Sequence, residues 1–220
     1  MAGLSLITDT NIFPLTTNEV KQSLRIDTDN FDQDAELTMM IRSAVKTIEE
    51  YLGRSLLTKV YDLYLDRIPY SQDDRLIEGI STGPDLRQSQ SFIYLPKAPI
   101  SQVQFFKYYN DSDTATTFAT SNYYVDTVSE PPRVVLRRGS SFPDVSNLRV
   151  ANAFQIRFDA GYGTAPKDVP EAIKHGVSLY VSHLYENREL FLEQKQVPVP
   201  MMLEAFLRPY RVVRFGSKLG

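Results

Sequence analysis

Apolar side chains recur every three or four residues between about positions 34 and 52, which is the pattern of a helix with one buried face. The residues of this stripe are Leu37, Met40, Ile41, Ala44, Val45, Ile48 and Leu52. Gly53 follows at the position where a residue with a positive φ angle commonly ends a helix. The pattern therefore predicts a helix over residues 34–52 that ends at Gly53.

A shorter helix is predicted before this one. Thr16 and Glu19 have the spacing of a capping box, in which the Thr16 hydroxyl accepts from the backbone N–H of Glu19 and the Glu19 carboxylate accepts from that of Thr16. Val20 and Leu24 then share one helix face, and an acidic stretch at residues 27–34 separates the two helices.

The helical spacing returns after Pro166. A proline at 170 and an acid at 171 are typical of a helix start. The apolar stripe that predicts a helix over about residues 170–188 consists of Ile173, Val177, Tyr180, Val181, Leu184 and Tyr185. A further short helix is predicted around residues 203–207, and residues 211–215 partly alternate in strand fashion.

Between these helical regions the apolar side chains alternate, and β-branched and aromatic residues dominate, as in strands. The predicted strands are residues 57–66, 92–95, 100–109, 123–128, 133–137 and 154–159. Turn residues separate them, and residues 71–91 are predicted to form a long loop. Because no helix intervenes, the strands favour a small antiparallel sandwich or barrel.

This order of elements predicts an α+β fold. A small helical bundle, residues 1–53 and 168–208, is interrupted by an inserted antiparallel β domain, residues 54–167, and is followed by an extended C-terminal arm, residues 209–220. The two long apolar stripes are expected to pack against each other, because their apolar side chains would otherwise stay exposed to water.

Composition narrows the class of protein. The chain has 220 residues, with 24 Lys and Arg against 27 Asp and Glu, a formal net charge of −3, and no cysteine. The absence of cysteine excludes a disulfide scaffold, thiolate metal sites and a cysteine nucleophile. No apolar run reaches the ~20 residues that span a bilayer, and the first residues lack the basic flank of a secretion signal. We therefore expect a soluble, cytoplasmic product without a membrane partner.

The charges are distributed unevenly along the chain. The first 50 residues carry nine acidic and four basic side chains, whereas the last thirteen carry four basic side chains and no acid. Such an acidic head and basic tail can attract each other between copies, or each can meet a different partner. Two solvated surfaces without a partner are the alternative.

No motif predicts a catalytic residue, a metal or a cofactor. His175 and His183 lie eight residues apart on one predicted helix, and too few further ligands accompany them for a zinc site. The acidic stretch lacks the Gly and the final Glu of a calcium loop. The segment from Gly161 to Pro166 lacks the third glycine of a dinucleotide loop, and a turn out of the β region explains it better. We therefore expect no enzyme.

The β region is rich in tyrosine. In the pairs Tyr108-Tyr109 and Tyr123-Tyr124, alternation places one ring of each pair on the face away from the core. Exposed tyrosines suit a protein interface, and they also stack on sugars or bases. Base stacking normally accompanies a basic groove, whereas this chain is acidic overall. An interface is therefore the preferred interpretation, and a carbohydrate-binding module and a nucleic-acid-binding protein that uses the basic tail remain as alternatives.

The order and spacing of several segments resemble the head–tail connector (adaptor) proteins of tailed bacteriophages and related gene-transfer particles, in their long form with a β-domain insertion. The segments that carry the resemblance are residues 15–27, 34–37, 48–56, 158–163, 169–173, 183–189 and 207–211.

The resemblance implies a structural role in the virion, at the junction of head and tail, after assembly in the host cytoplasm. Such proteins form a homo-oligomeric ring of about twelve copies under the portal protein. The ring extends the DNA channel, through which double-stranded DNA passes without sequence recognition, and it provides the docking platform for stopper or tail proteins. A carbohydrate-binding β module of a phage tail or baseplate is the alternative.

Three groups of residues are expected to serve such contacts. The arm is expected to bind the portal or a neighbouring copy through Pro209, Tyr210, Arg211, Val212, Val213, Arg214 and Phe215. The acidic residues expected to face the channel or a neighbour are Asp27, Asp29, Asp32 and Asp34. The residues expected at a β-domain interface are Tyr108, Tyr109, Tyr123 and Tyr124.

Overall fold

The computed structural model describes residues 2–68, 92–143, 147–187 and 201–212. These residues fall into two compact units, each built from separate stretches of the chain. The β unit lies within residues 1–9, 59–160 and 212–220, and the helical unit lies within residues 10–58 and 161–211. Helices and antiparallel sheets are thus both present, and the predicted α+β class is confirmed.

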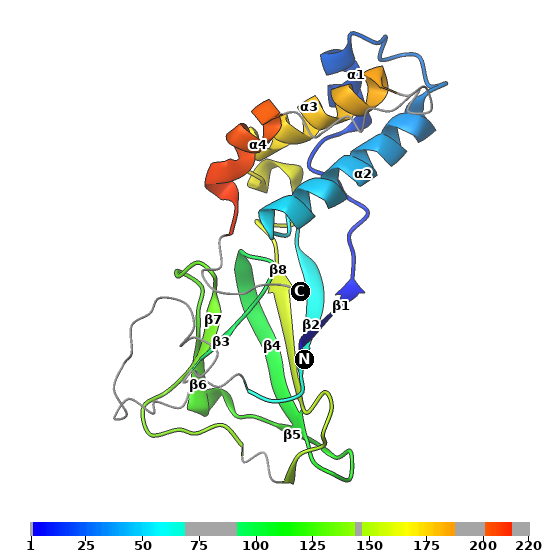
Figure 1. Cartoon of the computed structure of the whole chain (residues 1–220). Helices are drawn as coiled ribbons and strands as arrows, with labels where there is room; N and C mark the ends of the chain where they lie inside the picture. Colours follow the sequence, from blue (N-terminus) through cyan, green and yellow to red (C-terminus); the bar gives the residue numbers. More distant parts are fainter. Residues whose placement is uncertain (1, 69–91, 144–146, 188–200, 213–220) are drawn as a thin grey trace. The chain divides into compact units, whose positions relative to one another are not determined.

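The helical unit is organised around two long helices that lie alongside each other (Figure 1). Its helices are α1 (Thr17–Leu24), α2 (Asp34–Leu52), α3 (Glu171–Glu186) and α4 (Met201–Leu207). The apolar stripes of α2 and α3 meet in one core, where Leu37, Ile41, Ile173 and Val177 are at most 1% exposed. The expected packing of the two stripes is confirmed.

Local signals set the helix ends as predicted. The backbone N–H of Glu19 donates to Thr16 Oγ1 over 3.2 Å, and the backbone N–H of Thr16 donates to Glu19 Oε2 over 2.6 Å. The Thr16 backbone N–H, as the larger effect, and the Thr16 hydroxyl lower the pKa of Glu19 because they stabilise the carboxylate. Gly53 ends α2 with a φ of 67°, and its N–H turns back to the last carbonyls of the helix.

The β unit contains two antiparallel sheets. The five-stranded sheet has the order β1-β2-β8-β4-β5, and the three-stranded sheet has the order β3-β7-β6. Its strands are β1 (Ala2–Thr8), β2 (Lys59–Leu65), β3 (Phe92–Tyr94), β4 (Ile100–Tyr109), β5 (Ala115–Thr117), β6 (Tyr123–Asp126), β7 (Arg133–Leu136) and β8 (Phe154–Ala160). For the described residues, the open alternatives of sandwich and barrel thus resolve to two sheets with no closed barrel.

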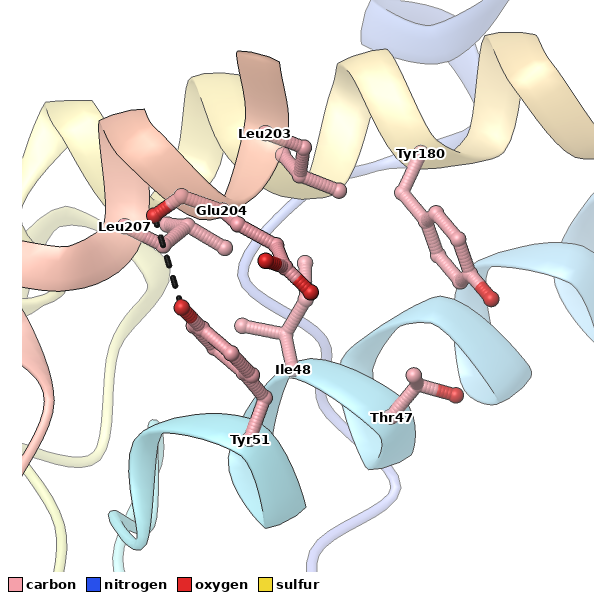
Figure 2. Close-up of a pocket in the computed structure, with 7 residues that line it drawn as sticks. All are labelled: Thr47, Ile48, Tyr51, Tyr180, Leu203, Glu204 and Leu207. Atoms are coloured by element: carbon pink, nitrogen blue, oxygen red, sulfur yellow. Dashed lines mark hydrogen bonds between the residues drawn. The ribbon is translucent and has the colours of Figure 1, made fainter. Parts of the chain in front are cut away.

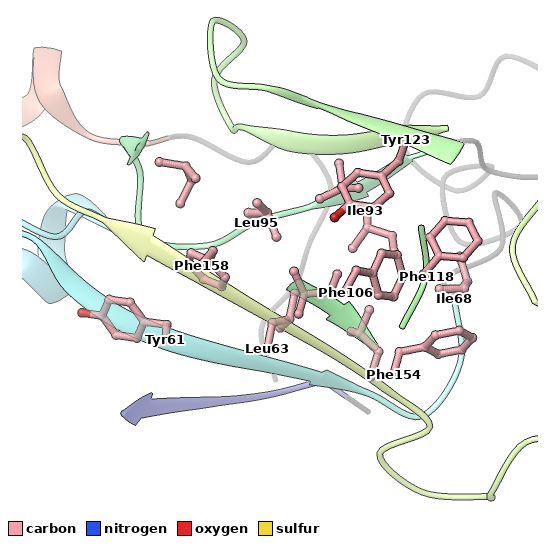
Figure 3. Packing of buried hydrophobic residues seen from close by; sticks show 14 of the residues in the cluster. Tyr61, Leu63, Ile68, Ile93, Leu95, Phe106, Phe118, Tyr123, Phe154 and Phe158 are labelled. Atoms are coloured by element: carbon pink, nitrogen blue, oxygen red, sulfur yellow. The ribbon is translucent and has the colours of Figure 1, made fainter. Parts of the chain in front are cut away.

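An aromatic cluster fills the core of the β unit (Figure 3). Phe106 on β4 is fully buried, and its ring centroid lies 5.1 Å from that of Phe118 and 5.9 Å from that of Tyr123. Residues of β8 alternate between this core and the outer face: Phe154 and Ile156 point inward, whereas the residue between them does not. The predicted alternation of these strands is therefore realised in the packing.

The structure differs from the sequence-based boundaries at the ends of the inserted domain. Residues 2–8, expected with the helical bundle, form β1 and pair with β2, with Ala2 opposite Leu65. Conversely, residues 54–58 and 161–167 belong to the helical unit. The physical reason is pairing between distant segments: the N–H of Thr58 donates to the Gly163 carbonyl over 2.9 Å.

The glycine-containing segment is a turn, as expected. Gly161 has a φ of 144°, and a Cβ there would collide with the backbone of Leu57. A Cβ on Gly163 would likewise collide with the Asp168 side chain. Gly161 is therefore required by the close approach of the Leu57 backbone and Gly163 by that of the Asp168 side chain, and this explains the motif without a phosphate ligand.

Candidate interaction surfaces

The acidic stretch between α1 and α2 wraps around a buried lysine. Lys21 is 0% exposed, and its Nζ donates to the carbonyls of Thr28, over 3.3 Å, and of Asn30, over 2.7 Å. The same ammonium forms an ion pair with Asp34 Oδ1 at 2.5 Å and lies 4.9 Å from the centre of the Phe31 ring. One cation thus organises the loop, because it satisfies carbonyls that are 7 and 9 residues away from it in sequence.

The four acidic residues singled out in the sequence divide into two kinds. Asp27, Asp29 and Asp32 are exposed, whereas Asp34 is half-buried in its ion pair with Lys21. Asp27 Oδ1 accepts the N–H of Asp29 over 3.1 Å, which shapes the turn without neutralising the carboxylate. Three carboxylates therefore remain on the surface of the helical unit, whereas the Asp34 carboxylate forms an ion pair within the chain.

The beginning of the predicted arm is attached to the helical unit. Pro209 and Tyr210 lie in a short 3₁₀ helix, Arg208–Tyr210. Arg54 Nε donates to the Tyr210 carbonyl over 2.5 Å, and the Arg211 guanidinium lies 5.1 Å from the centre of the Tyr51 ring. The chain therefore leaves the helical unit only after residue 211, and of the predicted contact residues Val212 is half-buried while Val213, Arg214 and Phe215 lie outside the described residues.

A small apolar pocket lies between α2, α3 and α4 (Figure 2). Its volume is about 90 Å³, and its lining residues are Thr47, Ile48, Tyr51, Tyr180, Leu203, Glu204 and Leu207. The Tyr51 hydroxyl donates to the Glu204 carbonyl across one side, over 3.4 Å. Ligand pockets for drug-sized molecules measure about 300–1,000 Å³, so this pocket has the size of a packing defect or of a site for one apolar side chain.

The outer face of the five-stranded sheet carries a buried polar network. Asp62 is 1% exposed and accepts from Arg157 Nε over 2.7 Å, from Arg157 Nη2 over 2.8 Å and from Gln155 Nε2 over 2.7 Å. Burial alone would raise the pKa of Asp62, but these hydrogen bonds outweigh it and hold the pKa below its ordinary value. The Arg157 guanidinium also lies 4.9 Å from the Phe105 ring centre. This face therefore presents a partly exposed guanidinium that two hydrogen bonds hold against Asp62.

The tyrosine pairs are divided as alternation predicts. Tyr123 is 4% exposed and lies in the core of the β unit, and the half-buried Tyr108 packs against this core. Tyr109 lies on the outer face, where its hydroxyl donates to Gln155 Oε1 over 2.5 Å, and Tyr124 is 47% exposed. Of these four rings, Tyr124 is therefore the exposed one and Tyr109 is half-buried on the outer face, whereas Tyr123 lies in the core and Tyr108 packs against the core.

In the part of the chain that the structure describes, neither histidine lies in a group of further metal ligands. The His175 ring centroid lies 5.6 Å from that of Phe206, and His183 Nδ1 lies 3.2 Å from Asn187 Nδ2. Among the described residues, no group of three or more His, Cys, Asp or Glu side chains could hold a metal ion. A helix long and apolar enough to cross a membrane is likewise not found in the described part of the chain.

Sequence reasoning missed the Lys21 centre, the pocket and the polar network. Each joins residues from segments that are distant in the chain or from several elements at once, so no local pattern in the sequence marks it. Exposed carboxylates, aromatic rings and a partly exposed guanidinium are side chains that suit contacts with other proteins.

The resemblance to the phage connector family is confirmed over part of the chain. Residues 15–75 match the model of the family described as Phage gp6-like head-tail connector protein. No curated protein matches the chain.

Solved structures with the same fold include three chains of gene transfer agent (GTA) particles. A chain in the neck of an empty GTA particle, computed with C6 symmetry, has 21% sequence identity and a TM-score of 0.72, with 96% of each chain covered. A chain in the virion of a native GTA particle has 21% identity and a TM-score of 0.71, again with 96% of each chain covered. A chain in the neck of a native GTA particle, computed with C12 symmetry, has 20% identity, a TM-score of 0.65 and the same coverage.

Proposed function

We propose that this chain is a structural head–tail connector (adaptor) of a tailed phage or a related gene-transfer particle. Identical copies form a ring of about twelve under the portal protein. The ring extends the DNA channel and is the docking platform for stopper or tail proteins. The chain acts in the virion, after assembly in the host cytoplasm.

One observation carries the proposal. The fold of a chain in the neck of a GTA particle matches this chain over 96% of both lengths, so both the helical unit and the inserted β unit have counterparts there. The match of residues 15–75 to the connector family agrees with it, because those residues include α1, α2 and the acidic loop.

Electrostatics supports a place for the acidic loop beside DNA or a neighbouring copy. Asp27, Asp29 and Asp32 keep exposed carboxylates on a loop whose carbonyls accept hydrogen bonds from Lys21. Carboxylates that face a channel repel phosphates, whereas a basic lining would bind them at every step of DNA passage. The same carboxylates could equally meet basic residues of a neighbour, which favours one arrangement of copies.

The proposed function is tested with particles that lack the chain. We expect such particles to have DNA-filled heads without attached tails, and supplying the chain from a second gene should restore tail attachment. Electron microscopy of complete particles should then locate a tagged chain at the neck. Normal tailed particles made without the chain would contradict the proposal.

A truncation tests the arm. We propose that the residues after Val212 bind the portal or a neighbouring copy. Ending the chain at Val212 keeps the contacts of Tyr210 with Arg54 and of Arg211 with Tyr51, so the thermal unfolding of the helical unit should not change. We expect the number of heads that carry the chain to fall about tenfold, as for the loss of ~1.4 kcal/mol or more of binding free energy.

A matched variant separates charge from main-chain contacts in this experiment. Changing Arg214 and Lys218 to Gln removes the positive charge of the segment and keeps its length. If the truncated chain joins portal-bearing heads as well as the full chain does, the proposed role of the arm is wrong.

A further inference from the structure

Strand β1 lies at an edge of the five-stranded sheet and carries exposed apolar side chains without any charge. Among the described strands it pairs with β2 alone, and residues 3–8 are all exposed. Leu4, Leu6 and Ile7 are 41%, 45% and 44% exposed, and β1 contains no charged residue and no proline. Natural proteins protect open edges with charges, prolines or bulges, because such edges pair with other chains. The single irregularity of β1 lies between Leu6 and Thr8, so residues 2–6 keep a regular register that another strand could join.

The other end of the same sheet is also open. Strand β5, Ala115–Thr117, pairs only with β4 among the described strands, and all three of its residues are exposed and uncharged. The remaining open edges, β3 and β6, belong to the small sheet. Strand β6 ends in Asp126, which is ion-paired with Arg133, and β3 carries the rings of Phe92 and Tyr94. Strand β5 is therefore the second edge whose residues are all exposed and uncharged.

We propose that the edge of β1 in one copy of this chain pairs with the edge of β5 in the next copy, so that the five-stranded sheet continues from copy to copy. The inference rests on the proposed function, in which identical copies form a ring. In a ring of more than two copies each copy contributes two different surfaces, because a surface that pairs with itself closes a dimer. Strands β1 and β5 are two such surfaces, and both lack the charges that would oppose pairing.

Strand directions fix the kind of pairing. Each neighbouring pair of strands in the sheet is antiparallel, so β1 and β5, at positions one and five, run in the same direction. Copies related by rotation about an axis along the strands would therefore pair β1 with β5 in parallel. Leu4 and Leu6 would then gain cover from the next copy.

Engineered disulfides test the contact in assembled particles. The chain has no cysteine, so every disulfide arises from the introduced residues. Cysteine at Leu4, Ser5 or Leu6 is combined with cysteine at Ala115, Thr116 or Thr117, which covers the registers that the two edges allow. Within one copy the two strands are four strand spacings apart, about 19 Å, and a disulfide needs Cα atoms within about 7 Å. Each disulfide between these positions must therefore join two copies.

We expect at least one double variant to form linked dimers and longer ladders in oxidised particles, about tenfold more than either of its single variants. Dimers from β1 single variants alone would overturn the inference, because β1 would then pair with itself. An intramolecular disulfide between Ser5→Cys and Phe215→Cys would also overturn it, because the C-terminal segment would occupy the edge. Particles that contain the chain without any β1–β5 ladder contradict this inference alone, whereas particles that lack the chain contradict the proposed function as well.

Charged substitutions give a second measurement. The double variant Leu4→Lys and Leu6→Lys should incorporate into particles about tenfold less than the unchanged chain, because lysine on an edge opposes pairing. Val128→Lys and Val150→Lys are matched controls, since these valines of the β unit are 92% and 94% exposed and lie outside its strands. Equal incorporation of the edge variant and the controls would overturn the inference.

Discussion

Changing Phe106 to alanine should lower the free energy of unfolding of the β unit by about 3–5 kcal/mol. Phe106 is fully buried, and its ring lies within 6.2 Å, centroid to centroid, of the rings of Phe118, Tyr123, Phe142 and Phe154. Alanine would leave a cavity at the centre of this cluster, and edge-on ring contacts would be lost together with apolar burial. Urea unfolding followed by circular dichroism measures the change.

Phe105 provides the matched control, because it is the neighbouring phenylalanine on the other face of β4. Its ring is half-buried and lies 4.9 Å from the Arg157 guanidinium, outside the core. Phe105→Ala should therefore cost only about 1 kcal/mol. If both substitutions cost the same, the assignment of these two residues to opposite faces of the sheet is wrong.

Replacing Lys21 by methionine should destabilise the helical unit by about 2–3 kcal/mol. Methionine keeps most of the volume of the buried stem, but it leaves the carbonyls of Thr28 and Asn30 without their donor. The loss is smaller than for a fully buried ion pair, because the Asp34 side chain is 35% exposed and can turn to water. Amide hydrogen exchange in residues 27–33 should rise along with the loss of stability.

Lys46→Met is the control for this substitution. Lys46 lies on the exposed face of α2, so its replacement should change the free energy of unfolding by less than about 0.5 kcal/mol. A Lys21 variant that is as stable as this control, with unchanged exchange in the loop, would mean that the ammonium does not organise the acidic stretch. In that case the exposed carboxylates would have no fixed arrangement to offer a partner.

Features that depend on neighbours in sequence were predictable. The capping box at Thr16 and Glu19, the positive φ at Gly53 and the apolar stripes of α2 and α3 each follow from spacings of three or four residues. That one ring of each tyrosine pair points away from the core follows from the two-residue period of a strand in the same way, and the structure shows that these are Tyr109 and Tyr124. These signals need no knowledge of the rest of the chain.

Features that depend on pairing across the chain were missed. Residues 2–8 alternate only briefly, and they form a strand because they pair with β2, with Leu4 opposite Leu63. Strand β5 has three residues and depends on its pairing with β4. Lys21 appears from the sequence to be an ordinary helix lysine, and its role becomes visible only when the loop carbonyls surround it.

The sequence by itself determined that two helical stretches enclose a β region. It also determined where most of the helices and strands begin and end, and which kinds of side chain to expect at the surface. Only the tertiary structure decided which segments pair, which tyrosines lie in the core and, among the described strands, which edges remain open. The physical reason is that helix caps and apolar periods are local, whereas sheet order and burial arise from contacts between segments that are far apart in the chain.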